Sequence, residues 1–211
     1  MAEEKVGRQI VLPFTISVRI SFNSMRIRLG RSIITISGIL FAIAFLMSIL
    51  SQTAFQKALL ERGSPEISSR IVMDESTQAR IRWLVGLSLL VSIVGITNAM
   101  LMSVTERYRE IGTMKCLGAL DSFIIRLFML ESLFQGMAGS VGGVLLGFIS
   151  MFFLSLINYG GEIIRVFPGI EILKYAIFSL AVGLVLSVVG AIYPAYRAAR
   201  MIPADAMRKE E

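Results

Sequence analysis

Four long runs of residues without a charged side chain constrain this chain more than any other feature. In a sequence of 211 residues they are Ser32–Gln56, Trp83–Thr105, Ser132–Gly161 and Tyr175–Tyr196. Each run is longer than the roughly 20 residues that an α-helix needs to cross a hydrocarbon core of about 30 Å. Because that core contains no water, the backbone must satisfy its own hydrogen bonds, as a helix does. The sequence therefore predicts an all-α integral membrane fold with four transmembrane helices.

These helices place the whole chain, 1–211, in a single membrane domain. The transmembrane helices are predicted over residues 32–54, 82–105, 123–155 and 174–196. The connecting segments are an N-terminal segment (1–31), an outer loop (55–81), a cytoplasmic loop (106–122), a second outer loop (156–173) and a C-terminal tail (197–211).

The segment before the first run predicts an amphipathic elbow helix in the inner membrane surface. Apolar residues recur at intervals of three and four between Phe14 and Leu29, with arginines among them. Alternation over residues 16–22 is also compatible with a strand. The membrane helix that follows favours the helical interpretation.

Positive charge predicts the orientation. Of the 21 basic residues, 14 lie before the first run, between the second and third, or after the fourth, and seven lie in the other loops. Cytoplasmic segments carry the excess of Lys and Arg, so both termini and the loop over 106–122 are expected in the cytoplasm. The net charge of +6 follows from this asymmetry and from contact with anionic lipids. It does not call for nucleic acid as a partner.

The composition also excludes several chemistries. The chain has no histidine and a single cysteine, Cys116, so it offers no His-based catalysis, zinc cluster or intrachain disulfide. No Gly-Lys pair occurs, and a phosphate-binding loop of the GxxxxGK[ST] type is therefore absent from the sequence. No nucleophile lies beside a base, and no ring of charge lines a span, which argues against an intramembrane enzyme and a channel. We expect no catalytic residue, no metal and no cofactor bound by this chain.

A short cluster of mixed charge follows the second run without a break. Ile96–Ala119 leads from an apolar helix into charged residues that surround apolar ones, and the cluster ends at Gly118. A membrane helix joined to a compact amphipathic element is what a membrane protein needs to exchange force with a soluble partner. An ordinary cytoplasmic loop between two spans has the same appearance, so the pattern alone leaves both interpretations open.

Small residues recur every fourth position on the last two helices. Such stripes let membrane helices pack closely, because apolar side chains gain little by leaving lipid. The pattern predicts that the third and fourth helices pack against each other or against a second copy, and we favour this over a ligand groove. The residues expected in this packing are Gly139, Gly143, Gly147, Gly183, Ser187 and Ala191.

One acidic residue, Glu131, lies inside a predicted span, about 12 Å along a helix that begins near Phe123. A carboxylate at that depth needs a partner, and Arg126 or the polar end of the second helix near Asn98 are candidates. A structural polar contact is the interpretation we favour over a proton or substrate site.

Three stretches of this sequence resemble the FtsX-like permease family, the membrane subunits of ABC transporters of the MacB and LolC/LolE type. They are NAMLMSVTERYREIGTMKCLGA, FMLESLFQGMAGSVGGVLLG and YPAYRAARMIPADAMRKE. The stretch MRIRLGRSIITISGIL is also similar to the start of the family's first helix. Together these stretches touch all four predicted helices.

The resemblance implies two permease subunits, as a homodimer or with a larger paralogous permease, each bound to a cytoplasmic ABC ATPase that holds ATP and Mg²⁺. ATP-driven motion would reach the outer face as mechanical work on a lipid, lipoprotein or peptide cargo. The cytoplasmic loop matches the family's coupling helix, which seats in the ATPase. The residues that match are Glu106, Arg107, Arg109, Glu110, Ile111, Gly112, Lys115 and Gly118.

The sequence departs from the family between the first two helices. Family members carry a large outer domain there, and this chain has about 30 residues, too few to bury a core. A second permease, a separate periplasmic or lipid-anchored subunit, or a membrane lipid as the cargo are three ways to make up for it. The alternative function is a regulatory scaffold, similar to the division protein that gives the family its name, acting through a docking surface around Glu61–Glu75.

Overall fold

The computed structural model of the chain describes residues 29–62, 75–159 and 168–201. The elbow helix predicted between Phe14 and Leu29, most of the docking surface predicted over Glu61–Glu75 and the end of the C-terminal tail lie outside the described residues.

Within these ranges the chain is helical, and the all-α fold with four long apolar helices is confirmed. The helices are α2 (Leu29–Arg62), α4 (Glu75–Glu106), α5 (Tyr108–Cys116), α6 (Asp121–Tyr159) and α8 (Gly169–Ala199). All except α5 are long and apolar enough to cross a membrane. The shortest of these four, α8, has 31 residues, a length of about 46 Å at 1.5 Å per residue. Each of the four helices therefore extends beyond an apolar core of about 30 Å.

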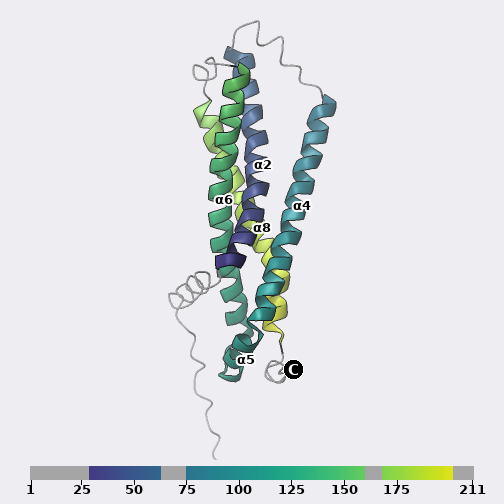
Figure 1. Cartoon of the computed structure of the whole chain (residues 1–211), viewed down its shortest axis with the longest axis vertical. Helices are drawn as coiled ribbons and strands as arrows, with labels where there is room; N and C mark the ends of the chain where they lie inside the picture. The colour runs from purple at the N-terminus through teal and green to yellow at the C-terminus, as the bar shows by residue number, and fades with distance from the viewer. Residues whose placement is uncertain (1–28, 63–74, 160–167, 202–211) are drawn as a thin grey trace, which may run out of the picture.

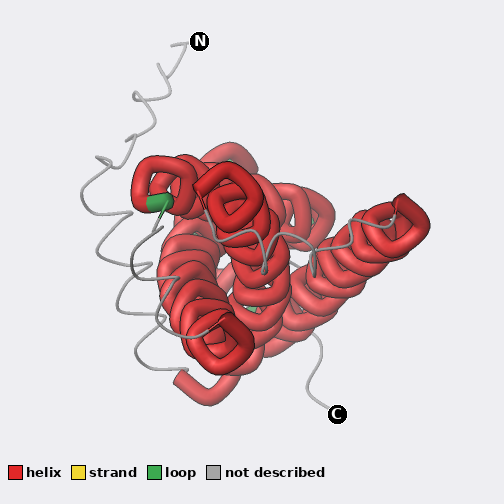
Figure 2. Tube along the Cα trace, turned by 90° about the horizontal axis from the view of Figure 1, so that it is seen from above, coloured by secondary structure: helices red, strands yellow, loops and turns green. Residues whose placement is uncertain are grey.

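Helices α2, α6 and α8 run side by side along the long axis, and α4 leans away from them. Figure 1 shows α4 close to α8 near α5 and well apart from the other helices at its opposite end. Seen from above, the same end of α4 projects out of the bundle (Figure 2). We call the end of the molecule that carries α5 the α5 end, and the opposite end the far end.

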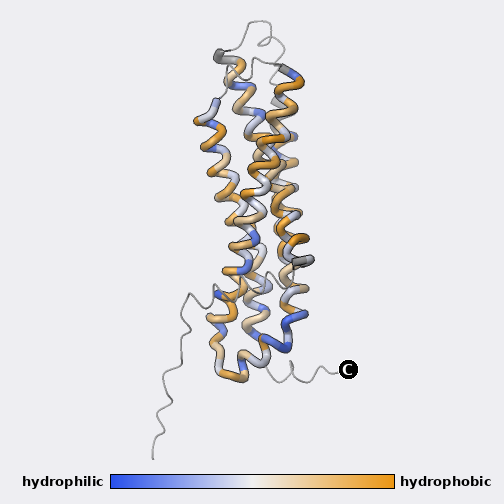
Figure 3. The backbone as a smooth tube through the Cα atoms, turned by 60° about the vertical axis from the view of Figure 1, so that its left-hand side comes forward, coloured by the Kyte–Doolittle hydropathy of each residue, from blue (hydrophilic) through white to orange (hydrophobic). Residues whose placement is uncertain are grey.

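Hydrophobic residues cover much of the outside of this bundle. Figure 3 shows hydrophobic colour along the middle of the long helices and hydrophilic segments near the α5 end. Exposed side chains include Phe41, Trp83, Leu146, Phe153 and Ile177. Water-soluble monomers rarely expose contiguous apolar surface on this scale. The surface is therefore suited to hydrocarbon, with the hydrophilic α5 end reaching past it.

The three-glycine stripe of α6 packs against α2. A Cβ atom added at Gly139 would lie 2.8 Å from the Cβ of Ile39, and one at Gly143 would lie 2.7 Å from the carbonyl oxygen of Leu40. One added at Gly147 would collide with the carbonyl oxygen of Ala44. The prediction that the third and fourth helices pack against each other is confirmed by α6 and α8, but this three-glycine stripe is covered by α2.

Other small residues bring α8 against α6 and α4. Gly136 faces Ser187, and a Cβ atom at Gly183 would lie 2.6 Å from the Cβ of Ser140. On the next face, a Cβ atom at Gly190 would lie 2.8 Å from Cγ2 of Ile96 in α4. Ala191 is buried in the main apolar core of the chain. The predicted packing residues of α8 therefore lie inside one chain, where they hold three helices together.

Candidate functional site

The helix α5 is a separate element because the chain bends at both of its ends. At its start Arg107 has φ −97° and ψ 13°. Helical hydrogen bonds reach Arg107 from both sides: its amide donates to the carbonyl of Ser103, and its carbonyl accepts from the amide of Ile111 (3.2 and 2.9 Å). Arg107 is therefore the residue at which one helical hydrogen-bond series ends and the next begins.

At the other end of α5 Gly118 adopts φ +90°, the one positive φ among the described residues. The amide of Gly118 donates to the carbonyl of Lys115, and the amide of Ala119 donates to that of Met114 (3.0 and 2.9 Å). This pair of bonds is the Schellman motif, which favours glycine at the left-handed position. The left-handed backbone conformation of Gly118 therefore explains why the cluster ends at this residue, as predicted.

The first anchor of α5 is a buried ion pair between Arg107 and Glu131 of α6. Arg107 Nη1 donates to Glu131 Oε2 at 2.8 Å, and Nη2 donates to Oε1 at 3.1 Å. Arg107 is 5% exposed and Glu131 is 3% exposed. Two parallel bonds to one carboxylate set the orientation of both side chains as well as their distance. The start of α5 is thus fixed against the first third of α6.

Glu131 has the partner that a buried carboxylate requires, but the partner is neither candidate named from the sequence. Arg126 and Asn98 are both exposed. On a helix, successive residues are about 100° apart, so Arg126, five residues from Glu131, lies on another side of α6. The observed partner comes from the charged cluster that follows the second apolar run, and the side chain of Arg107 is therefore turned inward.

The second anchor of α5 is Lys115. Its Nζ atom donates to the carbonyl oxygens of Ala199 and Met201, the latter at 3.0 Å, and lies 2.9 Å from Oδ1 of Asp121. The last carbonyls of a helix carry partial negative charge, which a lysine stabilises. Lys115 thus joins the end of α5 to the end of α8 and to the start of α6.

The eight residues predicted to couple to an ATPase therefore separate into two groups. Four hold α5 to the bundle, because Arg107, Ile111 and Gly112 are buried and Lys115 is half-buried against α8. Four lie in the exposed surface: Glu106, Arg109, Glu110 and Gly118. The structure thus brings all eight to one end of the molecule and assigns them to two faces.

The exposed face of α5 also contains residues that the sequence interpretation did not select. Leu117 is 89% exposed, and Leu120 is exposed nearby. Thr113 and Cys116 are exposed on the same helix. Leucine is more often buried than exposed, so the residue type carried no signal of the exposure of Leu117. We use the name outer face of α5 for the exposed residues Glu106, Arg109, Glu110, Thr113, Cys116, Leu117 and Gly118.

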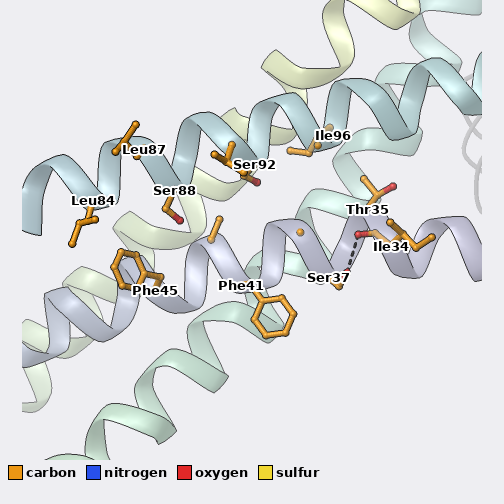
Figure 4. Close-up of a pocket in the computed structure, with 14 residues that line it drawn as sticks. Ile34, Thr35, Ser37, Phe41, Phe45, Leu84, Leu87, Ser88, Ser92 and Ile96 are labelled. Atoms are coloured by element: carbon orange, nitrogen blue, oxygen red, sulfur yellow. Dashed lines mark hydrogen bonds between the residues drawn. The ribbon is translucent and has the colours of Figure 1, made fainter.

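A second candidate site is a groove between α2 and α4, where α4 leaves the bundle. Its volume is about 720 Å³. Figure 4 shows Phe45 of α2 and Leu84 of α4 on its opposite walls, with Ser88 and Ser92 among the apolar side chains. The hydroxyl oxygen of Ser92 is buried and has no hydrogen-bond partner within the described residues. The groove is mainly apolar with a few hydroxyl groups.

The described residues contain no group of three or more His, Cys, Asp or Glu side chains that could hold a metal ion. Neither candidate site therefore has the ligands of a metal centre in the part of the chain that the structure covers.

Comparison with known proteins places the outer face of α5 inside a recognised domain. Residues 83–203 match the family FtsX-like permease C-terminal. The chain is 32% identical over 159 residues to the macrolide export ATP-binding/permease protein MacB of Nitrobacter winogradskyi, covering 75% of this chain and 22% of that protein.

Two shorter proteins are similar over 59% of the chain. An uncharacterized ABC transporter permease of Methanocaldococcus jannaschii, MJ1507, is 35% identical over 127 residues. Another from Bacillus subtilis, YknZ, is 35% identical over 128 residues. The chain covers 31% and 30% of these two proteins. It thus spans between a fifth and a third of the length of these relatives.

Proposed function

The chain belongs to the FtsX-like permease family, and from this premise we propose that it is the membrane subunit of an ABC transporter whose ATPase is a separate protein. The relative from Nitrobacter is named as both ATP-binding protein and permease. The present sequence has no phosphate-binding loop of the GxxxxGK[ST] type. In this proposal ATP and Mg²⁺ bind to the partner ATPase, and this chain contributes no catalytic residue.

The outer face of α5 docks on that ATPase. The observation that carries this proposal is the combination of a firmly held helix and an exposed leucine. α5 is joined to α6 by Arg107 and to α8 by Lys115, and directly after the second anchor the chain presents Leu117, which is 89% exposed. A partner that covers this leucine removes its apolar surface from water, which is favourable. A docking element that is fixed to the bundle also passes on a displacement that a flexible loop would absorb.

The orientation follows from the same assignment. We place α5 and both termini in the cytoplasm, where the ATPase and its nucleotide are, and the chain in the bacterial inner membrane. The asymmetry of Lys and Arg supports this orientation. Membrane lipids cover the exposed apolar surface of the long helices. Nucleic acid has no part in this function.

A second permease subunit, either another copy of this chain or a larger paralogous permease, packs beside α4. The supporting observation is the exposed apolar surface of this helix toward the far end, outside the groove, which includes Trp83 and Leu90. The short outer loop leaves no large outer domain in this chain. A larger paralogue, or a separate periplasmic or lipid-anchored subunit, supplies the contact with cargo at the outer face.

The groove between α2 and α4 favours a lipidic cargo over a polar one. Its volume of about 720 Å³ is in the range of small-molecule pockets, and its walls are mainly apolar. Among the lipid, lipoprotein and peptide cargoes that the family suggests, we therefore propose a molecule with an acyl chain, moved or extracted at the outer face by the ATP-driven cycle.

The test is gentle purification from native membranes, followed by mass spectrometry of the proteins that accompany the chain. We expect a stoichiometric ATPase with the unchanged chain and with Ile170→Asp, which changes an exposed residue at the far end. Leu117→Asp should lose the ATPase, because it puts a charge into the docking surface. An ATPase accompanied by a cell-wall hydrolase or its activator would favour the regulatory scaffold. No ATPase with the intact bundle would refute the proposal.

A further inference from the structure

The buried ion pair at the start of α5 is costly for a membrane protein. Two charges removed from water lose several kcal/mol of hydration each, and replacing such a pair by apolar residues of similar volume is often neutral or stabilising. Arg107 and Glu131 therefore need not be present for stability. What apolar residues cannot reproduce is the fixed direction of two parallel hydrogen bonds.

The position of Arg107 in the chain connects this ion pair with the bend between α4 and α5. Arg107 is the single residue between α4, which ends at Glu106, and α5, which begins at Tyr108. Its backbone makes the bend, and its side chain binds Glu131 on α6. The backbone of this one residue thus sets the angle between α4 and α5, and its side chain fixes that bend to α6.

The surroundings of the pair extend the polar contact to α2. Ser32 and Thr35 of α2, Ser103 of α4 and Gln135 of α6 line a cavity of about 10 Å³ beside the pair. The Oε1 atom of Gln135 is buried and has no hydrogen-bond partner within the described residues. The cavity is the size of one water molecule, and a water there would donate to this oxygen. Polar groups of three long helices therefore meet at the bend.

We infer that Arg107 and Glu131 are positioning residues that set the angle between α4 and α5, so that the outer face of α5 moves with α4 and α6 as one body. A water molecule on Gln135 completes this polar joint. The inference rests on the proposed docking of an ATPase, because the joint determines how a displacement of α5 reaches the membrane helices. It assigns to Arg107 a role inside the permease instead of a contact with the ATPase.

Two variants separate positioning from stability. The double variant Arg107→Met with Glu131→Leu removes both charges and keeps apolar volume, so neither charge is left buried without a partner. Arg107→Lys keeps the charge but lacks the planar fork that binds both carboxylate oxygens. The matched control is Arg126→Lys, since Arg126 is exposed on α6. The helical content of each purified variant, measured by circular dichroism, reports whether the bundle has folded.

The first measurement uses the permease alone, with a spin label on Cys116, the single cysteine of the chain and an exposed one. We expect a more mobile spectral component in the double variant, a smaller one in Arg107→Lys, and the parent spectrum in Arg126→Lys. A parent spectrum in a folded double variant would overturn the inference. Because no ATPase is present, this result does not depend on the proposed function.

The second measurement is the rate of ATP hydrolysis by the ATPase that accompanies the chain, with each variant in place of the parent. We expect the stimulation by the permease to fall at least about fivefold in the double variant, the lower end of typical coupling between two sites. Arg107→Lys should lie between the double variant and the parent. A folded double variant that stimulates hydrolysis as the parent does would overturn the coupling role. If no ATPase binds even the parent chain, the proposed function fails, and the label experiment still decides the positioning.

Discussion

The two halves of α4 are similar in composition and different in surroundings. Toward the α5 end, Ile96, Met100 and Val104 are buried. Toward the far end, Trp83, with 74% of its surface exposed, and Leu90 face outward. One continuous helix of 32 residues therefore belongs to the core of the bundle at one end and stands apart from it at the other.

Hydrophobicity therefore does not decide which part of a membrane helix packs against other helices. In lipid, an exposed leucine costs little, and contact between helices depends on close approach and on polar groups. The half of α4 near α5 meets Gly190 of α8 and ends at the buried Arg107. The half near the far end borders the groove instead.

The largest difference in stability is expected when one arginine is removed at each end of α4. Arg107→Ala leaves Glu131 as a buried charge without its partner, which should lower the free energy of unfolding by about 3–5 kcal/mol. Arg80→Ala removes an exposed side chain at the other end of α4 and should change it by less than about 0.5 kcal/mol. Denaturant titration of the purified bundle in micelles measures both values. Equal effects would mean that the two ends of α4 do not differ as described.

A smaller difference in stability is expected when each of two glycines is replaced by leucine. Gly190→Leu inserts a side chain at a position where even an added Cβ atom would lie only 2.8 Å from Ile96. Overpacking of this kind costs about 1–3 kcal/mol. Gly86→Leu is the matched change on α4, in open space with no atom within 4 Å. The same titration should show a loss of stability for the first variant alone. If Gly190→Leu were tolerated as well as Gly86→Leu, α4 and α8 would not be in close contact.

The smallest contrast concerns two threonines of α4. The hydroxyl group of Thr97 shares its one hydrogen between the carbonyl oxygen of Ile93 in its own helix at 2.9 Å and that of Gly190 in α8 at 3.0 Å. Thr105 is exposed and donates only within its own helix, to Met102 at 2.8 Å. Thr97→Val should cost about 0.6 kcal/mol, the usual value of a hydrogen bond between membrane helices. Thr105→Val should cost less, and the reverse order would place the contact between helices elsewhere.

The number and type of the long helices could be predicted from the sequence because the thickness of a bilayer sets the length of an apolar helix. The end of α5 could be located as well, since Gly118 interrupts a short cluster whose helical residues continue up to it. These features depend on local chain properties and on the solvent, and both can be read along one sequence.

The faces of the helices could not be predicted in the same way. Arg107 and Arg109 are two residues apart, about 200° around a helix, so one turns inward when the other turns outward. The sequence does not say which one, because both arginines stand in the same charged cluster. Likewise, the spacing of Gly139, Gly143 and Gly147 indicates a close-packed face, but the identity of α2 as its partner depends on how the whole bundle is assembled.

The proposed docking of an ATPase on the outer face of α5 can be tested at Cys116, the one cysteine of the chain, which is exposed on that face. The measurement is the rate at which a bulky maleimide reacts with Cys116 in inverted inner-membrane vesicles, with the accompanying ATPase bound and after its removal. We predict slow reaction when the ATPase is bound and rapid reaction once it has been removed. The same rapid reaction in both states would contradict docking at α5.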